Sequence, residues 1–593
     1  MDKPPAALWV MGLSVRLFGL SSAAILLPEV LMGVASVGVL YATVRRAFGA
    51  GAGLVAGLVL ALTPVAVLMF RYNNPEALLV LLMTLATWAT LRAVEAGSVR
   101  WFSLAGVFLG LGFLTKGLQV LLVVPFLGLA WLVLADTSLR RRALGAVVGA
   151  AALLASAGWW VAVVELVPAS ARPYVGGSQT NSFLELTFGY NGLGRLSGEE
   201  TGSVTAGPAG AGSRWGETGL WRMFDASIGG QISWLIPSAL LLLVAGLLLR
   251  GRAPRTDLRR AAYVAWGGWL LVTMLVFSFM AGIFHEYYTV ALAPAVAALV
   301  GMGAAEAWAQ RASWRGRVPL AAATLAAGIW SWVLLNRTDA YAPWLGVGVL
   351  LVALAAAGAL VVGRALVSLA AAAALVAGLT GPAAYSVTTV LDAHTGSIVT
   401  AGPRTGSGMP GGPGGPARVA RPRVARPRAA SPGRPAPGGQ TQNGQAATGQ
   451  APTGGPAGGP GGGLLDASEP GAEVVRALTA DAGSYTWVAA TAGAQNAAGL
   501  QLATELPVLA IGGFNGSDPS PTLAQFQQLV AEGRIHYFLA DGGPGGGGPG
   551  GGPGGGMGGS GTAAEITSWV TESFTQVSLG GQTYYDLTQP VSG

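Results

Sequence analysis

Hydrophobic runs of roughly 18 residues or more recur up to residue 390 of this 593-residue chain, and arginines mark every second gap between them. Runs of this length predict helices that cross the hydrocarbon core of a membrane. Only 10% of the residues are charged, against about 25% in a soluble globular domain. The sequence therefore predicts a mainly α-helical, polytopic membrane protein. We expect about twelve spans, at 21–43, 51–70, 75–92, 101–118, 119–135, 143–167, 231–250, 261–283, 287–309, 318–336, 343–363 and 366–386.

The arginine alternation predicts the orientation of these spans in the cytoplasmic membrane. Short cytoplasmic loops collect Lys and Arg, so the arginine-rich gaps should face the cytoplasm. These gaps hold Arg45/Arg46, Arg92/Arg100, Arg140 to Arg142, Arg250 to Arg260, Arg311 to Arg317, and Arg364. The alternate gaps should face outward, and they are 71–76, 115–117, the long loop 168–230, and 285–288.

Residues 1–20 form the end of an external loop and an interfacial helix in this scheme. Residues 5–20 are too short and too interrupted to span a membrane. Arg45 and Arg46 put the end of the first span inside, so residues 1–20 lie outside. An external N-terminus without a signal peptide usually needs an upstream span, so we expect one more helix to be encoded before Met1. The alternative is translocation of a short tail.

The C-terminal third differs in composition from the predicted transmembrane domain, residues 21–390. Residues 391–463 predict a disordered Pro/Gly/Arg linker. Residues 464–593 alternate short strands with helices, which predicts a small extracytoplasmic α/β domain. A Gly-rich insertion at 542–561 interrupts it and lacks the Lys-Ser/Thr of a phosphate loop. The chain has no cysteine, which excludes disulfides.

Chemically unusual residues gather in the outward-facing segments. Ionisable side chains at membrane depth are costly and point to function. Their cations suit a phosphate or diphosphate at the membrane surface, and Asp2 and Glu76 could act as a base, a metal ligand or a partner for sugar hydroxyls. The predicted catalytic residues are Glu76 and Asp2. The predicted substrate-binding residues are Lys3, Arg71, Asn74, Lys116, Tyr190, Asn191, Arg195, His285 and Tyr288.

Several of these segments resemble the motifs of a known enzyme family. Asp2-Lys-Pro-Pro followed by Leu8-Trp9 is similar to the segment after the first external loop of polyprenyl-phosphate-dependent GT-C glycosyltransferases of family 39. That family is related to protein O-mannosyltransferases and to lipid A aminoarabinose transferases. The rest of the chain resembles an actinobacterial branch of that family, which has a Gly-rich tether and a C-terminal α/β domain. The motifs are Arg71-Tyr-Asn-Asn-Pro-Glu76, Gly112-Phe-Leu-Thr-Lys-Gly117, Phe188-Gly-Tyr-Asn-Gly-Leu-Gly-Arg195, Gly229-Gly-Gln-Ile-Ser-Trp234 and His285-Glu-Tyr-Tyr288.

The resemblance implies transfer of a sugar from a polyprenyl-phosphate-linked donor to an extracytoplasmic cell-envelope acceptor, with inversion. Lys3 matches the family's phosphate-contacting lysine, and Asp2 matches an acid that joins a metal site in some relatives. Glu76 stands where the family usually has aspartate, and Glu286 stands where the branch more often has proline. The family's principal catalytic aspartate lies in the first external loop, upstream of Met1.

Other interpretations stay open at this point. A divalent metal is a candidate cofactor with Asp2 and His285 as ligands, although a histidine beside two tyrosines is more typical of an interfacial belt. A transporter or flippase for a lipid-linked precursor should show internal repeats, and we find none between the halves. A non-catalytic, truncated family member is a third alternative. The arginines lie at membrane boundaries or in the linker, so the net charge of +7 does not predict nucleic-acid binding.

Overall fold

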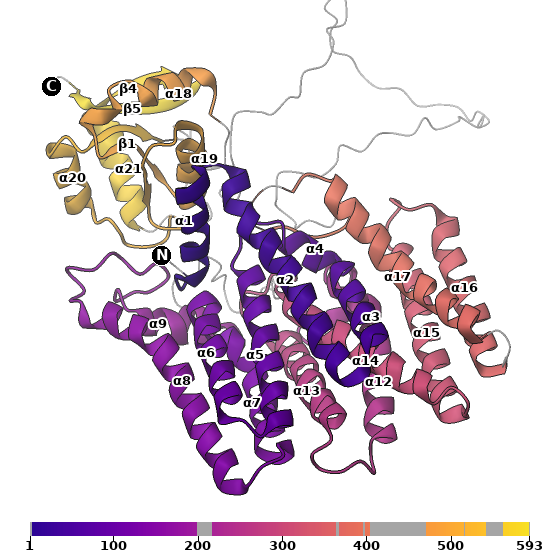
Figure 1. Cartoon of the computed structure of the whole chain (residues 1–593). Helices are drawn as coiled ribbons and strands as arrows, with labels where there is room; N and C mark the ends of the chain where they lie inside the picture. The colour runs from indigo at the N-terminus through magenta and orange to yellow at the C-terminus, as the bar shows by residue number, and fades with distance from the viewer. Residues whose placement is uncertain are drawn as a thin grey trace, which may run out of the picture.

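The computed structural model describes residues 3–198, 216–362, 367–394, 396, 398–403, 470–514, 516–540 and 561–591. A helical body holds α1 to α17, and a smaller domain with five strands sits above one of its ends (Figure 1). Both parts of the predicted fold class are therefore present.

Ten helices in the described residues are long and apolar enough to span a membrane. They are Ser22–Phe48, Glu76–Ala96, Val99–Leu134, Leu139–Leu166, Gly229–Leu249, Leu258–Phe279, Glu286–Ala309, Trp314–Leu335, Pro343–Val362 and Val367–Leu391. In the same order they contain α2, α5, α6 with α7, α8, α11 with α12, α13, α14, α15, α16 and α17. The expectation of about twelve spans differs from this count at two places.

The first difference is the predicted span 51–70. It folds as α3 (Ala50–Ala61) and α4 (Pro64–Met69), and each is too short to span alone. Pro64 cannot donate a backbone N–H, so the helix breaks just before it and restarts with proline in its first turn.

The second difference concerns the spans predicted at 101–118 and 119–135, which are counted together as Val99–Leu134. The segment nevertheless reverses at Gly117, whose φ of +58° suits glycine. Helix α6 (Val99–Lys116) leads into the turn, and α7 (Val124–Leu129) lies on the return arm. Asp136 N donates to Val94 O at 3.3 Å, so the chain comes back to the end where α6 began. The tight hairpin expected at Lys116 is therefore present.

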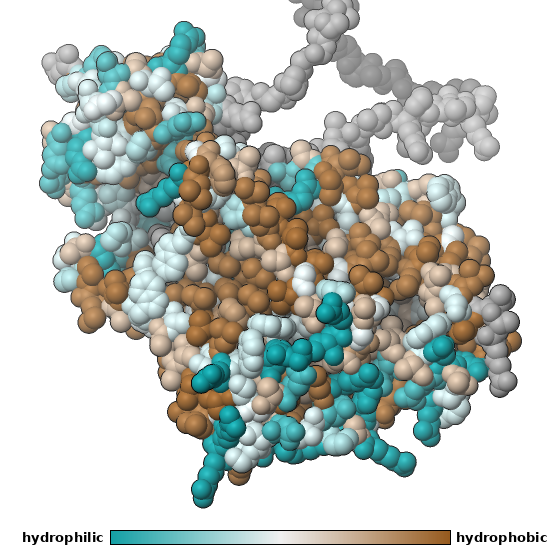
Figure 2. Space-filling view, viewed as in Figure 1, coloured by the Kyte–Doolittle hydropathy of each residue, from teal (hydrophilic) through white to brown (hydrophobic). Residues whose placement is uncertain are grey.

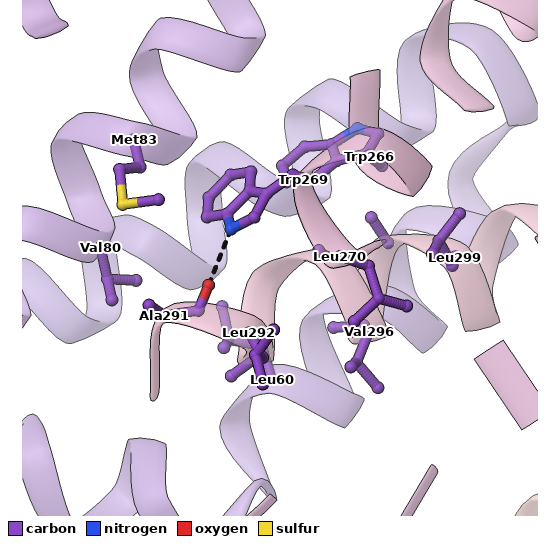
Figure 3. Close-up of a cluster of buried hydrophobic side chains, with 14 of the residues drawn as sticks. Leu60, Val80, Met83, Trp266, Trp269, Leu270, Ala291, Leu292, Val296 and Leu299 are labelled. Carbon is purple, nitrogen blue, oxygen red and sulfur yellow. Dashed lines mark hydrogen bonds between the residues drawn. The ribbon is translucent and has the colours of Figure 1, made fainter. Parts of the chain in front are cut away.

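The core of the helical body packs around two tryptophans of α13 (Leu258–Phe279). Trp266 and Trp269 stack with ring centroids 5.2 Å apart and are fully buried. Trp269 Nε1 donates to Ala291 O at 2.8 Å in the non-α-helical segment that opens the α14 span (Figure 3). This bond satisfies a carbonyl that an irregular helix start would otherwise leave unpaired in an apolar interior.

The surface of the body separates into zones. A broad apolar face covers its middle, and hydrophilic side chains gather at the end opposite the small domain (Figure 2). The connection between α12 and α13, which leads into the segment Arg250 to Arg260, lies at that end, called the arginine end below (Figure 1). Arg259 at the start of α13 pairs with Glu306, and Arg46 at the end of α2 pairs with Glu95 at the end of α5. Helix α1 (Ala6–Phe18) lies near the small domain and has 13 residues, and its Leu13, Leu17 and Phe18 side chains are exposed.

The C-terminal domain contains a five-stranded sheet of order β2-β1-β3-β5-β4. Strands β1 to β3 are parallel, whereas β5 pairs antiparallel with β3 and β4. Strand β4 lies at an edge of the sheet, and its side chains are mostly half-buried or exposed. The strands are β1 Trp487–Ala492, β2 Val508–Ile511, β3 Ile535–Leu539, β4 Phe574–Leu579 and β5 Gln582–Pro590, and the helices are α18 Ala472–Thr479, α19 Ala494–Thr504, α20 Leu523–Ala531 and α21 Gly561–Ser573.

The predicted linker is packed at its beginning. Helix α17 runs to Leu391, and Val399 and Ala401 are buried beyond it. The Gln231 side chain donates to Ala401 O at 3.0 Å and accepts from Ala401 N at 2.7 Å. The expectation of disorder from residue 391 is therefore wrong for 398–403, because a buried amide satisfies this short backbone segment. Residues 404–463 of the linker, and 542–560 of the Gly-rich insertion, lie outside the described residues.

Candidate active site

A cavity of about 150 Å³ opens at the end of the helical body where α6 turns at Gly117. Its wall is largely apolar and includes Leu118, Leu122 and Phe277. Three cationic side chains also line it: Lys3, Lys116 and Arg195. The described lining contains no aspartate or glutamate. The cavity therefore combines an apolar wall with positive charge.

Lys116 is held by Glu76 from the neighbouring helix. Lys116 ends α6, and Glu76 begins α5 (Glu76–Ala96). Each charge is therefore opposite in sign to the partial charge of its own helix end, which is stabilising. The lysine Nζ donates to Glu76 Oε1, and their side chains are 10% and 0% exposed. Asn74 Oδ1 accepts the Glu76 N–H at 3.1 Å and helps to fix the start of α5. Glu76 thus lies behind the cavity wall and positions the ammonium group that reaches it.

An aromatic ring joins Lys116 to Arg195. The lysine ammonium lies 3.9 Å from the ring centroid of Tyr288, an attractive cation–π arrangement. Arg195 Nη1 donates to the hydroxyl of the same tyrosine at 3.0 Å. Because Tyr288 contacts both cations, it sets the spacing between two positive charges at the cavity.

The loop after α9 (Phe183–Phe188) supplies Arg195 and its supports. Arg195 Nη2 donates to Asn191 Oδ1 at 3.2 Å, and its Nε donates to Tyr190 O at 3.1 Å. Its guanidinium also lies 4.9 Å from the Tyr190 ring centroid. Lys3 Nζ donates to the same Asn191 oxygen at 3.4 Å. Residues that are far apart in the chain therefore place their cations around one amide.

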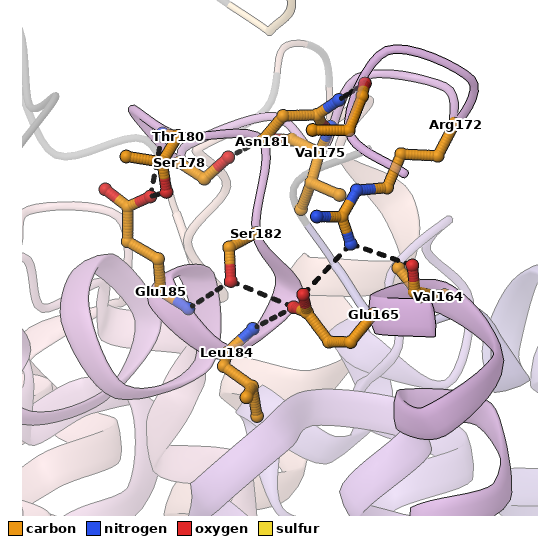
Figure 4. A network of polar contacts seen from close by, with 11 residues as sticks. Val164, Glu165, Arg172, Val175, Ser178, Thr180, Asn181, Ser182, Leu184 and Glu185 are labelled. Carbon is orange, nitrogen blue, oxygen red and sulfur yellow. Dashed lines mark hydrogen bonds and ion pairs between the residues drawn. The ribbon is translucent and has the colours of Figure 1, made fainter. Parts of the chain in front are cut away.

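A polar network holds the segment after α8 (Leu139–Leu166), which the sequence predicts to face outward, on the end of that helix. Glu165 Oε1 accepts from Ser182 Oγ and from Leu184 N, both at 2.9 Å (Figure 4). Arg172 donates to the other oxygen of Glu165 at 3.0 Å. The close-up shows these contacts between the helix end and the loop, so the loop that carries Arg195 has a rigid base.

His285 lies among aromatic rings and cations. Its ring stacks 5.3 Å from Tyr287 and meets Tyr288 edge-on at 5.3 Å. Burial lowers the pKa of His285 to about 3, and the charges of Arg195, Lys116 and Lys3 add to this effect. The described residues contain no group of three His, Asp or Glu side chains that could hold a metal ion. Asp2, the other candidate ligand, lies outside the described residues, so a divalent metal stays a prediction and we derive no step through one.

Three further residues predicted for the site, Arg71, Asp2 and Glu76, do not line the cavity in the described structure. Arg71 is exposed and does not line the cavity. Asp2 lies outside the described residues, so its predicted catalytic role stays a prediction. Glu76 also stays a predicted catalytic residue, although its placement behind Lys116 suits a positioning role better.

Sequence reasoning missed the part of the wall at the end of α13. Phe277 and Met280 line the cavity, and the buried Arg222 donates to their carbonyl oxygens at 3.2 and 2.6 Å. The Arg222 guanidinium also lies 4.4 Å from the Phe284 ring centroid. The sequence signal that could have singled out Arg222 was its place in a gap predicted to face outward, because the positive-inside rule disfavours arginine there.

Two segments of the chain match known protein families. Residues 2–161 match the family described as "Dolichyl-phosphate-mannose-protein mannosyltransferase", and residues 474–573 match "Putative mannosyltransferase YkcB-like, C-terminal". Both the start of the helical body and the C-terminal domain are therefore similar to mannosyltransferase families.

Its similar proteins include two from Bacillus subtilis. The "Putative mannosyltransferase YkcB" is 28% identical over 92% of this chain and 82% of its own length. The "Putative mannosyltransferase YycA" is 27% identical over 91% of this chain and 83% of its own length. Among solved structures, ArnT from Cupriavidus metallidurans bound to undecaprenyl phosphate aligns with a TM-score of 0.42 and 21% identity, over 64% of this chain and 65% of that one.

Proposed function

We propose that this chain transfers a sugar from a polyprenyl-phosphate donor to an acceptor in the cell envelope, at the outer face of the cytoplasmic membrane. The observation that carries the proposal is the cavity in which Lys3, Lys116 and Arg195 share a wall with apolar side chains. A lipid phosphate has matching parts, because its charged head suits the cations and its hydrocarbon chain suits the apolar wall.

The charges of the described residues support an anionic ligand. Glu76 pairs with Lys116 behind the wall, and the Lys3, Lys116 and Arg195 side chains all line the cavity. A phosphate monoester carries about −1.5 to −2 at neutral pH, and Arg and Lys bind it through charge-assisted hydrogen bonds. The three cationic side chains in one wall therefore suit a phosphate that gains charge as it leaves the sugar.

Inverting transfer would use these groups in a single displacement. The acceptor hydroxyl attacks the anomeric carbon on the face opposite the phosphate, and the bond from that carbon to the phosphate oxygen breaks. The bonding electron pair leaves with the phosphate, which the three cations stabilise. The hydroxyl proton passes to a carboxylate, for which Asp2 is the candidate, while Glu76 holds Lys116 in place.

The orientation follows from the two ends of the body. The cavity and the C-terminal domain lie at the end away from the arginine end. Since arginine-rich loops stay in the cytoplasm, the site and the C-terminal domain would be extracytoplasmic. Mannose is the first sugar to test, because both Bacillus relatives are described as mannosyltransferases.

The full chain in nanodiscs, supplied with radiolabelled polyprenyl-phosphate mannose and a cell-envelope fraction, tests the proposal. We expect transfer by the wild type and a loss of about tenfold to a hundredfold in kcat/KM for Lys3→Ala, because a charge-assisted hydrogen bond is worth about 1.5–3 kcal/mol. Arg92→Ala, at the arginine end, is the control and should transfer normally. The chain is also placed in liposomes, where movement of the lipid from one leaflet to the other without sugar transfer would instead support a transporter.

A further inference from the structure

The C-terminal domain contacts the external loop of the helical body at one well-defined hydrogen bond. Asp518 Oδ1 accepts the backbone N–H of Gly177 at 3.0 Å, although the two residues are 341 positions apart in the chain. Asp518 is only 8% exposed. A hydrogen bond to a buried carboxylate is among the stronger polar contacts in a protein, and losing it leaves a desolvated charge.

The turn that carries Asp518 is built around its carboxylate. Gly512 and Gly513 have φ values of +72° and +68°, a conformation that favours glycine. A Cβ atom on Gly513 would lie 2.0 Å from Asp518 Oδ2, so a larger residue would displace the carboxylate. Asp518 N also donates to Gly512 O at 3.0 Å. The turn therefore presents this acceptor in a fixed direction.

Gly177 in turn packs against the residues that support the cavity. A Cβ on Gly177 would lie 3.1 Å from both Leu186 and Tyr190. Leu186 lines the cavity, and Tyr190 contacts Arg195 through both its carbonyl oxygen and its ring. A continuous series of contacts thus runs from the C-terminal domain to a cation at the cavity.

We propose that Asp518 is a positioning residue for the lipid-phosphate site: by accepting the Gly177 N–H, it holds residues 174–195 so that Tyr190 keeps Arg195 at the cavity. The inference rests on the proposed function, because it assigns the C-terminal domain a part in binding the donor. The domain then acts on the donor site from outside the cavity, and it touches no reacting atom.

The test compares Asp518→Ala with Asp518→Asn in the full chain in nanodiscs. The asparagine oxygen can still accept the Gly177 N–H, whereas alanine cannot. Glu572→Ala, which removes an exposed acid of the same domain, is the matched control. Binding of undecaprenyl phosphate, the donor KM and kcat, and amide hydrogen exchange across 174–190 are measured for each protein.

For Asp518→Ala we expect about tenfold weaker binding and a similar rise in donor KM, given the strength of such a hydrogen bond, with kcat nearly unchanged and faster exchange in the loop. Asp518→Asn and Glu572→Ala should resemble the wild type. Unchanged binding in Asp518→Ala, or equal loss in Asp518→Asn, would overturn the proposal. A wild type that binds no lipid phosphate would overturn the proposed function and this positioning role together. Faster exchange in Asp518→Ala would then still report the contact itself.

Discussion

Two buried glutamates at opposite ends of the helical body make the same kind of contact in different surroundings. Glu306, at the arginine end, pairs with Arg250 at 2.8 Å and with Arg259 at 3.2 Å. Asp257 lies 3.7 Å from Arg250, so two acids face two arginines. At the cavity end, Glu76 pairs with Lys116, and Lys3 and Arg195 line the same cavity.

The difference lies in what surrounds the two ion pairs. At the arginine end, Glu306 accepts from Arg250 and Arg259, and these contacts hold helix ends together. At the cavity end, Lys116 pairs with Glu76 and also lines a cavity whose wall carries Lys3 and Arg195 beside apolar side chains. Cations that line an apolar cavity suit an anionic amphiphile, which is why the cavity points to function.

The largest expected effect comes from Lys116→Ala. It removes a cation from the cavity and leaves Glu76 buried without its partner, a change that destabilises proteins by about 3–5 kcal/mol. We expect sugar transfer to fall by at least about a hundredfold, together with a lower thermal unfolding midpoint. The double variant Lys116→Ala/Glu76→Gln should recover the midpoint and not the transfer. Recovery of both would show that Lys116 serves stability alone.

Glu306→Ala should lower the stability of the protein without changing its donor site. It leaves Arg250 and Arg259 without their shared acceptor, so the unfolding midpoint should drop, while donor KM of the folded protein stays at the wild-type value. Thermal unfolding followed by tryptophan fluorescence, paired with transfer kinetics, measures both. An increase in donor KM comparable to that of a cavity variant would break the distinction between the two ends.

Arg195→Lys sharpens the role of geometry at the cavity. The variant keeps the positive charge and loses the planar group that contacts Tyr288, Asn191 and Tyr190 together. We expect about tenfold weaker binding of undecaprenyl phosphate, measured by fluorescence quenching, because about one charged hydrogen bond is lost. Wild-type binding would mean that charge alone matters at this position.

The smallest effect is expected in the pH dependence of transfer. The pKa of His285 is about 3 in the folded protein against 6.5 for the free side chain, so the imidazole stays neutral from pH 5 to 8. His285→Gln should therefore leave the shape of the transfer profile unchanged over that range.

Stability should respond to His285 as the pH falls below about 6.5, where the imidazole of the unfolded chain takes up a proton. The unfolded chain takes up the proton first, so the histidine's contribution is complete above about pH 6.5 and is lost as the pH falls towards 3. The wild-type unfolding midpoint should accordingly drop more than that of His285→Gln between pH 7.5 and pH 5. Equal drops in the two proteins would contradict the lowered pKa.

Much of the fold could be predicted because its signals are local. The apolar runs and the alternating arginines predicted the spanning helices and distinguished the two ends of the body. The break at Pro64 was less visible, since the run 51–70 is apolar throughout and hydropathy does not register a missing N–H. Packing of 398–403 was not visible at all, because it depends on Gln231, which lies 170 residues from Ala401.

The sequence by itself determined that this is a helical membrane protein with an α/β domain at its C-terminal end, and it singled out the cations in the gaps predicted to face outward. The tertiary structure decided which of those residues share a site. It brought Lys3, Lys116 and Arg195 to one cavity, left Arg71 at the surface, and placed Glu76 behind Lys116. The reason is physical: hydropathy and charge act within a short segment, whereas the contacts that define a site depend on helix packing between distant parts of the chain.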